Sequence, residues 1–257
     1  MIMLFGGTTE GRQAAGLLDR LGVHYLYSTK AASTGFVMTH GQSRSGPLND
    51  MTMVALLAER KIRLVIDAAH PFAIGLHRTI ARASGTLGLP VIRFERDYRI
   101  DPDLLDPARV RYAGSFAAAI ALLTIMNPRL VLASTGVQTI EMLRPYWNSR
   151  EMMVRILDTE RSYGIARSAG FPPERLLRMT PSGSQDEEEA TIRTFGIDCL
   201  LCKENGTSGF LPVKLAAARS CGTAVVIVRR PDLPAMFRTL TSTVALQQAV
   251  MEARGEQ

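Results

Sequence analysis

The chain alternates short apolar runs with amphipathic stretches along most of its length. Apolar runs typical of buried strands cover residues 2–5, 23–28, 64–67, 91–94, 130–133, 153–157, 197–202 and 223–228. Helical spacing of apolar residues, with capping residues before it and glycine or proline after it, occupies 11–21, 50–61, 76–87, 115–127, a stretch from 184, 210–221 and 243–253. Strands that alternate with helices in this way predict an α/β fold with parallel sheets and right-handed crossovers.

One segment interrupts the alternation near the middle of the chain. Residues 101–107, Asp-Pro-Asp-Leu-Leu-Asp-Pro, hold two prolines and three aspartates and are typical of a linker. We therefore expect two mostly parallel sheets that face each other across a cleft. The predicted boundaries are residues 1–100 for the N-terminal domain, 108–240 for the C-terminal domain, and 241–257 for a final helix and tail.

Composition narrows the class of protein. The chain has 257 residues, of which 46% are hydrophobic and 21% charged, values typical of a globular protein rather than a disordered one. The net charge is +6, but no run of five Lys or Arg occurs, so we expect no nucleic-acid or membrane partner. Excess positive charge spread in this way suits a small anionic ligand.

The three cysteines favour a reducing, cytoplasmic setting. They are Cys199, Cys202 and Cys221, an odd number that predicts no disulfide framework. Cys199 and Cys202 have C-x-x-C spacing, but on a strand they point to opposite faces, and no nearby histidine completes a zinc site. We expect buried structural cysteines and no metal.

The first strand leads into a glycine-rich turn, Gly6-Gly-Thr-Thr-Glu-Gly-Arg12, at the sheet edge where open α/β sheets bind ligands. The turn lacks the Lys-Ser/Thr pair of a P-loop, which excludes that ATPase pattern. Gly6 and Gly11 fit the dinucleotide pattern G-x-G-x-x-G, while Thr8 replaces its middle glycine. The turn is either a variant dinucleotide-binding loop or an ordinary tight turn.

The second strand ends in Tyr27-Ser-Thr-Lys30, without the carboxylate that NAD-preferring sites place there. Two hydroxyls and an ammonium suit a 2′-phosphate, which favours NADPH. A solvated loop that is basic without binding a ligand is an equally good interpretation of these residues. Other strand ends carry His70 and an arginine-rich segment at 93–99. In the second half, Ser134-Thr-Gly136 and Lys203-Glu-Asn-Gly-Thr-Ser-Gly209 occupy corresponding places. Each is either a ligand contact or a structural or solvated group.

Taken together, these motifs resemble the precorrin-6A reductases of cobalamin biosynthesis. The resemblance rests on Leu4–Arg12, Ile66–Ala73, Arg93–Arg96, Ser134–Gly136, Lys203–Gly209 with Lys214, and Val226–Pro231, in order along nearly the whole chain. It departs modestly from the family at Ala69, where threonine is expected, and at Glu204, where asparagine or aspartate is common. It implies two Rossmann-like domains and NADPH- or NADH-dependent reduction of one double bond in a macrocyclic tetrapyrrole.

The resemblance also suggests roles for residues, with NADPH as the expected cofactor and a tetrapyrrole polycarboxylate as the substrate. Coenzyme contacts are expected from Gly6, Gly7, Thr8, Thr9, Glu10, Ser28, Thr29, Lys30, His70, Thr135 and Gly136. Substrate carboxylates are expected at Arg93, Arg96, Lys203, Ser208 and Lys214. His70, Tyr98 and Lys203 are the candidate catalytic residues for proton donation, and solvent is the alternative. Neighbouring enzymes of the pathway are candidate partners.

Three alternatives remain open at this level. A cobalt-precorrin-6A reductase that uses NADH would share the same motifs. An NAD(P)-dependent reductase of another small substrate would share the fold and the coenzyme site. A non-catalytic NAD(P)-sensing module would bind the coenzyme without oxidising it.

Overall fold

The computed structural model describes residues 1–31, 37–95, 99–205 and 209–255. The chain divides into two compact units, one formed by Met1–Asp97 with Asp232–Gln257 and the other by Tyr98–Pro231. Each unit is built on one six-stranded parallel sheet, so the predicted α/β class with parallel sheets is confirmed. No helix among the described residues is long and apolar enough to cross a membrane.

The first unit has the strand order β12-β5-β4-β1-β2-β3, and every pair of neighbours is parallel. Its strands are β1 (Ile2–Phe5), β2 (Tyr25–Thr29), β3 (Gly41–Ser45), β4 (Leu64–Asp67), β5 (Val91–Phe94) and β12 (Phe237–Leu240). Its helices are α1 (Thr9–Arg20), α2 (Asp50–Glu59), α3 (Ile74–Leu87) and α9 (Thr243–Arg254). Strands β1, β4 and β5 are buried throughout, as expected for strands covered on both faces.

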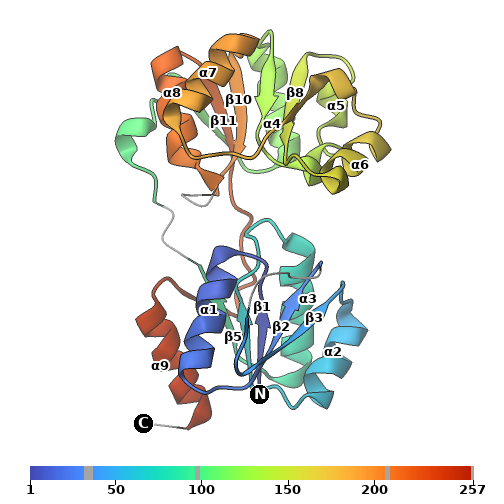
Figure 1. The fold of residues 1–257 in the computed structure, drawn as a ribbon, viewed down its shortest axis with the longest axis vertical. Helices are drawn as coiled ribbons and strands as arrows, with labels where there is room; N and C mark the ends of the chain where they lie inside the picture. The colour runs from blue at the N-terminus through green and yellow to red at the C-terminus, as the bar shows by residue number, and fades with distance from the viewer. Residues whose placement is uncertain (32–36, 96–98, 206–208, 256–257) are drawn as a thin grey trace. The chain divides into compact units, whose positions relative to one another are not determined.

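Helices cover both faces of this first sheet (Figure 1). Apolar residues of α1 and α9 pack with Leu4, Tyr25 and Ile66 on one face. Those of α2 and α3 pack with Met3 and Val65 on the other. Alternate residues of each strand therefore serve two separate apolar layers, which explains the nearly continuous hydrophobic runs in the sequence.

The second unit has the strand order β6-β11-β10-β7-β8-β9, again fully parallel. Its strands are β6 (Val110–Ala113), β7 (Val131–Ala133), β8 (Met152–Ile156), β9 (Leu176–Arg178), β10 (Cys199–Lys203) and β11 (Ala224–Val228). Its helices are α4 (Phe116–Met126), α5 (Arg144–Trp147), α6 (Glu160–Ser168), α7 (Gln185–Phe195) and α8 (Leu211–Cys221), with 3-10 turns at Pro102–Leu104, Val137–Thr139 and Pro173–Arg175. Helices α7 and α8 lie against each other and pack on one face of the sheet.

The two sheets share one topology over five of their strands. Five strands of each sheet run in the order 3-2-1-4-5, counted from β1 in the first and from β7 in the second, which is the Rossmann order. The strand beyond the fifth differs, because β12 comes last in the chain whereas β6 comes before β7. In such sheets the strand order reverses between strands 1 and 4, and ligands bind at the carboxyl ends there. These switch points lie between β1 and β4 in the first unit and between β7 and β10 in the second.

Strand β12 and the contacts of residues 101–107 explain why the units differ from the predicted domain boundaries. Strand β12 pairs with β5, with Thr239 opposite Arg93, so the segment from Asp232 belongs to the first unit rather than to the predicted 108–240 domain. The predicted linker 101–107 belongs to the second unit, where Arg219 donates a hydrogen bond to the carbonyl of Asp103. The second unit is thus inserted between two segments of the first.

Candidate functional site

The glycine turn after β1 lies at the switch point of the first sheet and requires glycine at two positions. A Cβ on Gly6 would fall 2.3 Å from Cζ of Tyr27, and a Cβ on Gly11 would fall 2.8 Å from the Cα of Gly6. Gly7 has φ +93°, a conformation that favours glycine. The turn therefore packs closely against both Tyr27 and the first turn of α1, as a dinucleotide-binding loop does.

Thr8 ends this turn and fixes its position. Its hydroxyl accepts the N–H of Gly11 at 3.0 Å, which caps α1, and donates to the carbonyl of Ala68 at 2.6 Å. The cap presents the positive end of the helix dipole at the switch point, where an anion is stabilised. Because both contacts are internal, the side chain of Thr8 positions two loops, and the predicted coenzyme contact would fall to the backbone of the turn.

The carboxyl end of β2 carries three polar residues that were predicted to face the adenosine end of the coenzyme. Ser28 is buried and its hydroxyl accepts a hydrogen bond from Arg44 at 2.8 Å. Thr29 donates to the carbonyl of Ala31 at 2.6 Å, and Lys30 is exposed. Of these three residues, Lys30 alone carries a charge, and that charge is accessible to a ligand.

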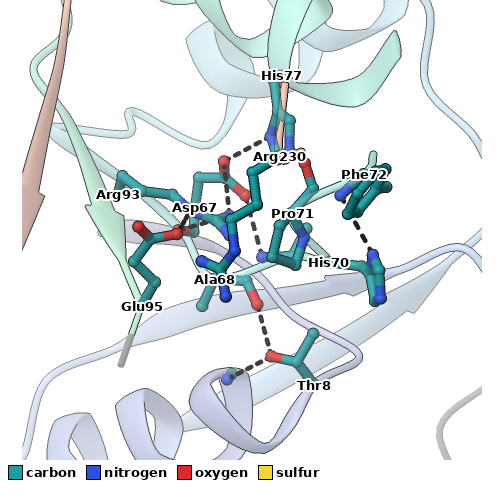
Figure 2. Close-up of polar contacts among 12 residues, drawn as sticks. Thr8, Asp67, Ala68, His70, Pro71, Phe72, His77, Arg93, Glu95 and Arg230 are labelled. Atoms are coloured by element: carbon teal, nitrogen blue, oxygen red, sulfur yellow. Dashed lines mark hydrogen bonds and ion pairs between the residues drawn. The ribbon is translucent and has the colours of Figure 1, made fainter. Parts of the chain in front are cut away.

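A buried group of four charged side chains stabilises the end of β4 (Figure 2). Asp67 is 0% exposed, and its Oδ2 lies 2.7 Å from Nδ1 of His77 and 3.1 Å from NH1 of Arg93. Arg93 also pairs through Nε with Oε2 of Glu95 at 3.2 Å. Two carboxylates, one guanidinium and one imidazole thus balance in charge when His77 is protonated.

His77 lies between two oxygen atoms near the end of β4. Its Nδ1 faces the carboxylate of Asp67, and its Nε2 lies 3.3 Å from the carbonyl oxygen of Pro71. The ring of His77 therefore links the carboxylate of Asp67 to the loop at Pro71. Burial alone would raise the pKa of Asp67, but the hydrogen bond from His77 and the charge of Arg93 lower that pKa overall.

This charged group holds the loop that carries His70. Oδ1 of Asp67 accepts the N–H of Ala69 at 3.0 Å, and His77 contacts the carbonyl of Pro71. The exposed ring of His70 accepts the N–H of Phe72 at Nδ1, at 3.2 Å. Because Nδ1 of the neutral ring accepts this hydrogen bond, its proton resides on Nε2, which is then a hydrogen-bond donor.

In the second unit, the loop after β7, a candidate ligand contact from the sequence, lies at the switch point. Gly136 is exposed with φ +85°. Thr135 is buried, and its hydroxyl lies 2.6 Å from that of Thr139. Lys203 ends the neighbouring strand β10, with Nζ 5.9 Å from the ring centroid of Phe116. Burial lowers the pKa of Lys203 to about 8.

Two predicted substrate cations turn out to be internal. Arg93 is 1% exposed and is paired with Asp67 and Glu95. Lys214 is 5% exposed, and its Nζ donates to the carbonyl of Gly209 at 2.6 Å. Neither is presented to a substrate carboxylate, because both lie in the interior and their charges serve internal partners. The predicted residues Arg96, Tyr98 and Ser208 lie outside the described residues.

Three residues of this region were not singled out from the sequence. Tyr27 accepts the N–H of Gly7 at 3.0 Å. His77 and Arg44 complete the contacts of Asp67 and Ser28. A signal existed for Asp67 and Arg93, since each is a charged residue in an otherwise apolar strand and therefore requires a buried partner. No local pattern marks Tyr27, His77 or Arg44.

Two Rossmann-order sheets, the first with a glycine turn and a capped helix at its switch point, define this chain as a Rossmann-type α/β protein. Its family follows from comparison with known proteins. A model of the family described as precorrin-6x reductase CbiJ/CobK matches residues 1–250. The chain therefore belongs to the precorrin-6x reductase family. The family resemblance inferred from the motifs is confirmed, and with it a reductase of cobalamin biosynthesis that uses a nicotinamide cofactor on a carbon–carbon double bond.

Individual relatives extend over most of the chain. A cobalt-precorrin-6A reductase of Methanothermobacter thermautotrophicus is 27% identical over 239 residues, which cover 90% of this chain and 77% of the relative. A precorrin-6A reductase of Rhodococcus erythropolis is 29% identical over 247 residues, covering 93% and 92%. A solved structure of CobK precorrin-6A reductase superposes with a TM-score of 0.78 at 22% identity and covers 99% of this chain and 98% of the other, which shows a common fold.

Proposed function

We propose that this chain reduces one double bond of precorrin-6A to give the dihydro product, precorrin-6B, with NADPH as the reductant. The observation that carries the proposal is the glycine turn at the switch point of the first sheet. There Gly6 and Gly11 allow a close approach of backbone, and α1 directs its positive end outward. A pyrophosphate is the ligand that such a turn accommodates.

The residues of the first unit fit this coenzyme. Gly6 and Gly7, with the backbone of Thr8, Thr9 and Glu10, would hold the pyrophosphate and its ribose. Ser28, Thr29 and Lys30 would lie at the adenosine end, and their lack of a carboxylate favours NADPH over NADH. When bound, the reduced nicotinamide supplies a hydride to one carbon of the double bond. A proton then completes the addition at the other carbon.

His70 and Lys203 are the proposed proton donors within the described residues. The hydrogen bond from Phe72 to Nδ1 leaves Nε2–H of the neutral His70 ring as a donor. Lys203 has a pKa lowered to about 8 by burial, so its ammonium releases a proton more readily than an exposed lysine does. Tyr98, which lies outside the described residues, and solvent remain the alternatives from the sequence.

Charge complementarity supports a polycarboxylate substrate. The chain carries a net charge of +6, and Lys203 provides a cation at the switch point of the second sheet, next to Thr135 and Gly136 on the neighbouring strand end. Arg96 and Ser208 stay proposed substrate contacts from the sequence. Family relatives bear both the precorrin-6A and the cobalt-precorrin-6A name, and the proposal concerns the double bond that both substrates contain. A cytoplasmic location, in which Cys199 and Cys202 stay reduced, completes the proposal.

A coupled assay tests the function. Full-length protein is mixed with NADPH and precorrin-6A, and the loss of reduced-nicotinamide absorbance is followed together with the mass of the product. We expect one NADPH to be consumed for each macrocycle that gains two hydrogen atoms. Coenzyme binding without oxidation in the presence of either precorrin-6A or its cobalt form would contradict the proposal and favour a sensing module.

A further inference from the structure

Arg44 lies beside the residues that end β2 and belongs to the neighbouring edge strand. Its Cα is the register partner of Ser28 on β2. NH1 of Arg44 donates to Oγ of Ser28 at 2.8 Å, and NH2 donates to the carbonyl of Ser45 at 3.1 Å. These two bonds hold the guanidinium at the carboxyl edge of the sheet, the edge that also carries the glycine turn.

The charge of Arg44 has no acidic counterpart in the part of the chain that the structure describes. Both of its hydrogen-bond acceptors are neutral, a hydroxyl and a carbonyl. The side chain is partly buried, and this burial lowers the pKa of Arg44, although arginine stays protonated in proteins. A partly desolvated cation that lacks a carboxylate is stabilised when an anion arrives.

The hydrogen-bonding geometry of the guanidinium favours a phosphate as this anion. Arginine offers five N–H donors in a planar fork, and Ser28 and Ser45 take up two of them. The remaining donors match the oxygens of a phosphomonoester, with which arginine forms bidentate contacts. In Rossmann-type sites the end of strand 2 faces the adenosine ribose, where an arginine accommodates a 2′-phosphate.

We propose that Arg44 binds the 2′-phosphate of NADPH and is the residue that selects NADPH over NADH in this chain. The inference rests on the proposed function and adds a residue that the sequence motifs do not include. Ser28 acts as a positioning residue, because its hydroxyl orients the guanidinium. Lys30, exposed at the end of the same strand, supplies additional positive charge near the phosphate.

The test compares Arg44→Gln with wild-type full-length protein by calorimetric titration of NADP⁺, NAD⁺, adenosine 2′,5′-bisphosphate and 5′-AMP. We expect the substitution to weaken binding of the two 2′-phosphorylated ligands about 30-fold, the loss of a charge-assisted contact. Binding of NAD⁺ and 5′-AMP should change less than about twofold. Unchanged NAD⁺ binding also shows that the variant is folded.

Arg60→Gln is the matched control. Arg60 also contacts β3, through a hydrogen bond of 3.4 Å to Oε1 of Gln42, but it is exposed and follows the end of α2. The control removes the same charge and should leave the preference for NADP⁺ over NAD⁺ intact. If Arg44→Gln weakens binding of NADP⁺ and NAD⁺ equally, or weakens binding of neither, the role of Arg44 is overturned while the proposed function stands. A wild-type protein that binds neither dinucleotide overturns the proposed function as well.

Discussion

The hydroxyl of Tyr27 accepts the backbone N–H of Gly7 at 3.0 Å. Tyr27 belongs to β2, whereas Gly7 lies in the turn that follows β1, so one buried side chain on a neighbouring strand supports the loop proposed to hold the coenzyme phosphates. The same ring occupies the space in which a side chain on Gly6 would stand. The shape of the turn is therefore determined jointly by its glycines and by Tyr27.

Tyr27→Phe should weaken coenzyme binding without changing its specificity. The variant keeps the ring under Gly6 but removes the acceptor of the Gly7 N–H. A lost hydrogen bond of about 1 kcal/mol corresponds to a dissociation constant about 5-fold higher. Titration of NADP⁺ and NAD⁺ should show the same factor for both, because the phosphates near the turn are common to the two ligands.

Tyr25→Phe provides the comparison for this prediction. Tyr25 lies on the same strand and faces the same apolar layer, but its hydroxyl lies 3.3 Å from Oδ2 of Asp19, near the other end of α1. Removal of that hydroxyl should leave coenzyme affinity at the wild-type value. A similar loss in both variants would mean that Tyr27 acts only through the stability of the core.

Asp67→Asn should destabilise the first unit strongly. The substitution leaves Arg93 and His77 buried without their central carboxylate, and removal of one partner from a buried ion pair costs about 3–5 kcal/mol. Hydrogen exchange of the backbone amides in β4 and α3 measures the effect. Asp50→Asn, which breaks an exposed pair with Arg82, should cause a much smaller loss; equal losses would contradict a central role for Asp67.

The contribution of Asp67 should depend on pH with a definite sign. Its folded-state pKa is lowered from the ordinary value of about 4, so its ionisation stabilises the fold above that pH. As the pH falls through the folded-state pKa, this stabilisation is lost. The difference in amide protection between wild type and Asp67→Asn should therefore shrink in acid. A difference that stays constant down to acid unfolding would show that Asp67 is not ionised in the folded protein.

Glu188→Gln should destabilise the second unit. Glu188 and Arg155 form a buried pair, with NH2 of Arg155 2.8 Å from Oε2 of Glu188, and the loss of one partner costs about 3–5 kcal/mol. The chain has one tryptophan, Trp147, which is buried against Phe171 in this unit, so its fluorescence during denaturation reports on the second unit. Glu189→Gln, on the same helix, removes the charge of a partly exposed carboxylate whose partner Arg193 is exposed, and should lower the midpoint less than Glu188→Gln does.

Lys203 should impose a basic limit on activity. If its ammonium binds a substrate carboxylate or donates the proton, kcat/KM falls as the pH rises through the lysine pKa of about 8. Lys203→Arg keeps its charge at higher pH and should therefore show, above that value, the lower KM that wild type has only below it. Lys203→Met should raise KM below that value, where the wild-type lysine is charged, and much less above it. An unchanged pH profile in Lys203→Met would exclude Lys203 from the reaction.

The strands that the sequence pattern predicts and the strands that it does not predict occupy different positions in the sheets. All four strands that the apolar runs do not predict are edge strands: β3, β6, β9 and β12. Each of them contains exposed or partly buried residues, as in the Gly-Gln-Ser-Arg-Ser run of β3, so no continuous apolar pattern marks them. The failure to predict β12 also explains the misplaced domain boundary, since this strand joins the sheet of the first unit.

The residues of the candidate site also fall into some that the sequence predicts and some that only the fold brings together. The glycine turn was predictable because glycine spacing is local and its place after the first strand is visible in the sequence. The partners of Asp67 were not, because His77 comes from α3 and Arg93 from the next strand, and only the fold brings them together. The sequence also shows only the charge of Arg93 and Lys214, not their burial. Both were therefore predicted as ligand contacts, although both are interior residues.

The return of the chain to its first sheet has a consequence for the folding of this protein during its translation. The second unit is one uninterrupted segment, Tyr98–Pro231, whereas β12 and α9, which complete the first unit, are translated after it. Leu246, Ala249 and Val250 of α9 cover the apolar layer shared with α1. During synthesis on the ribosome, the sheet face that α9 covers therefore stays unshielded until the whole of the second unit has been translated, and we expect the second unit to be able to fold before the first is complete.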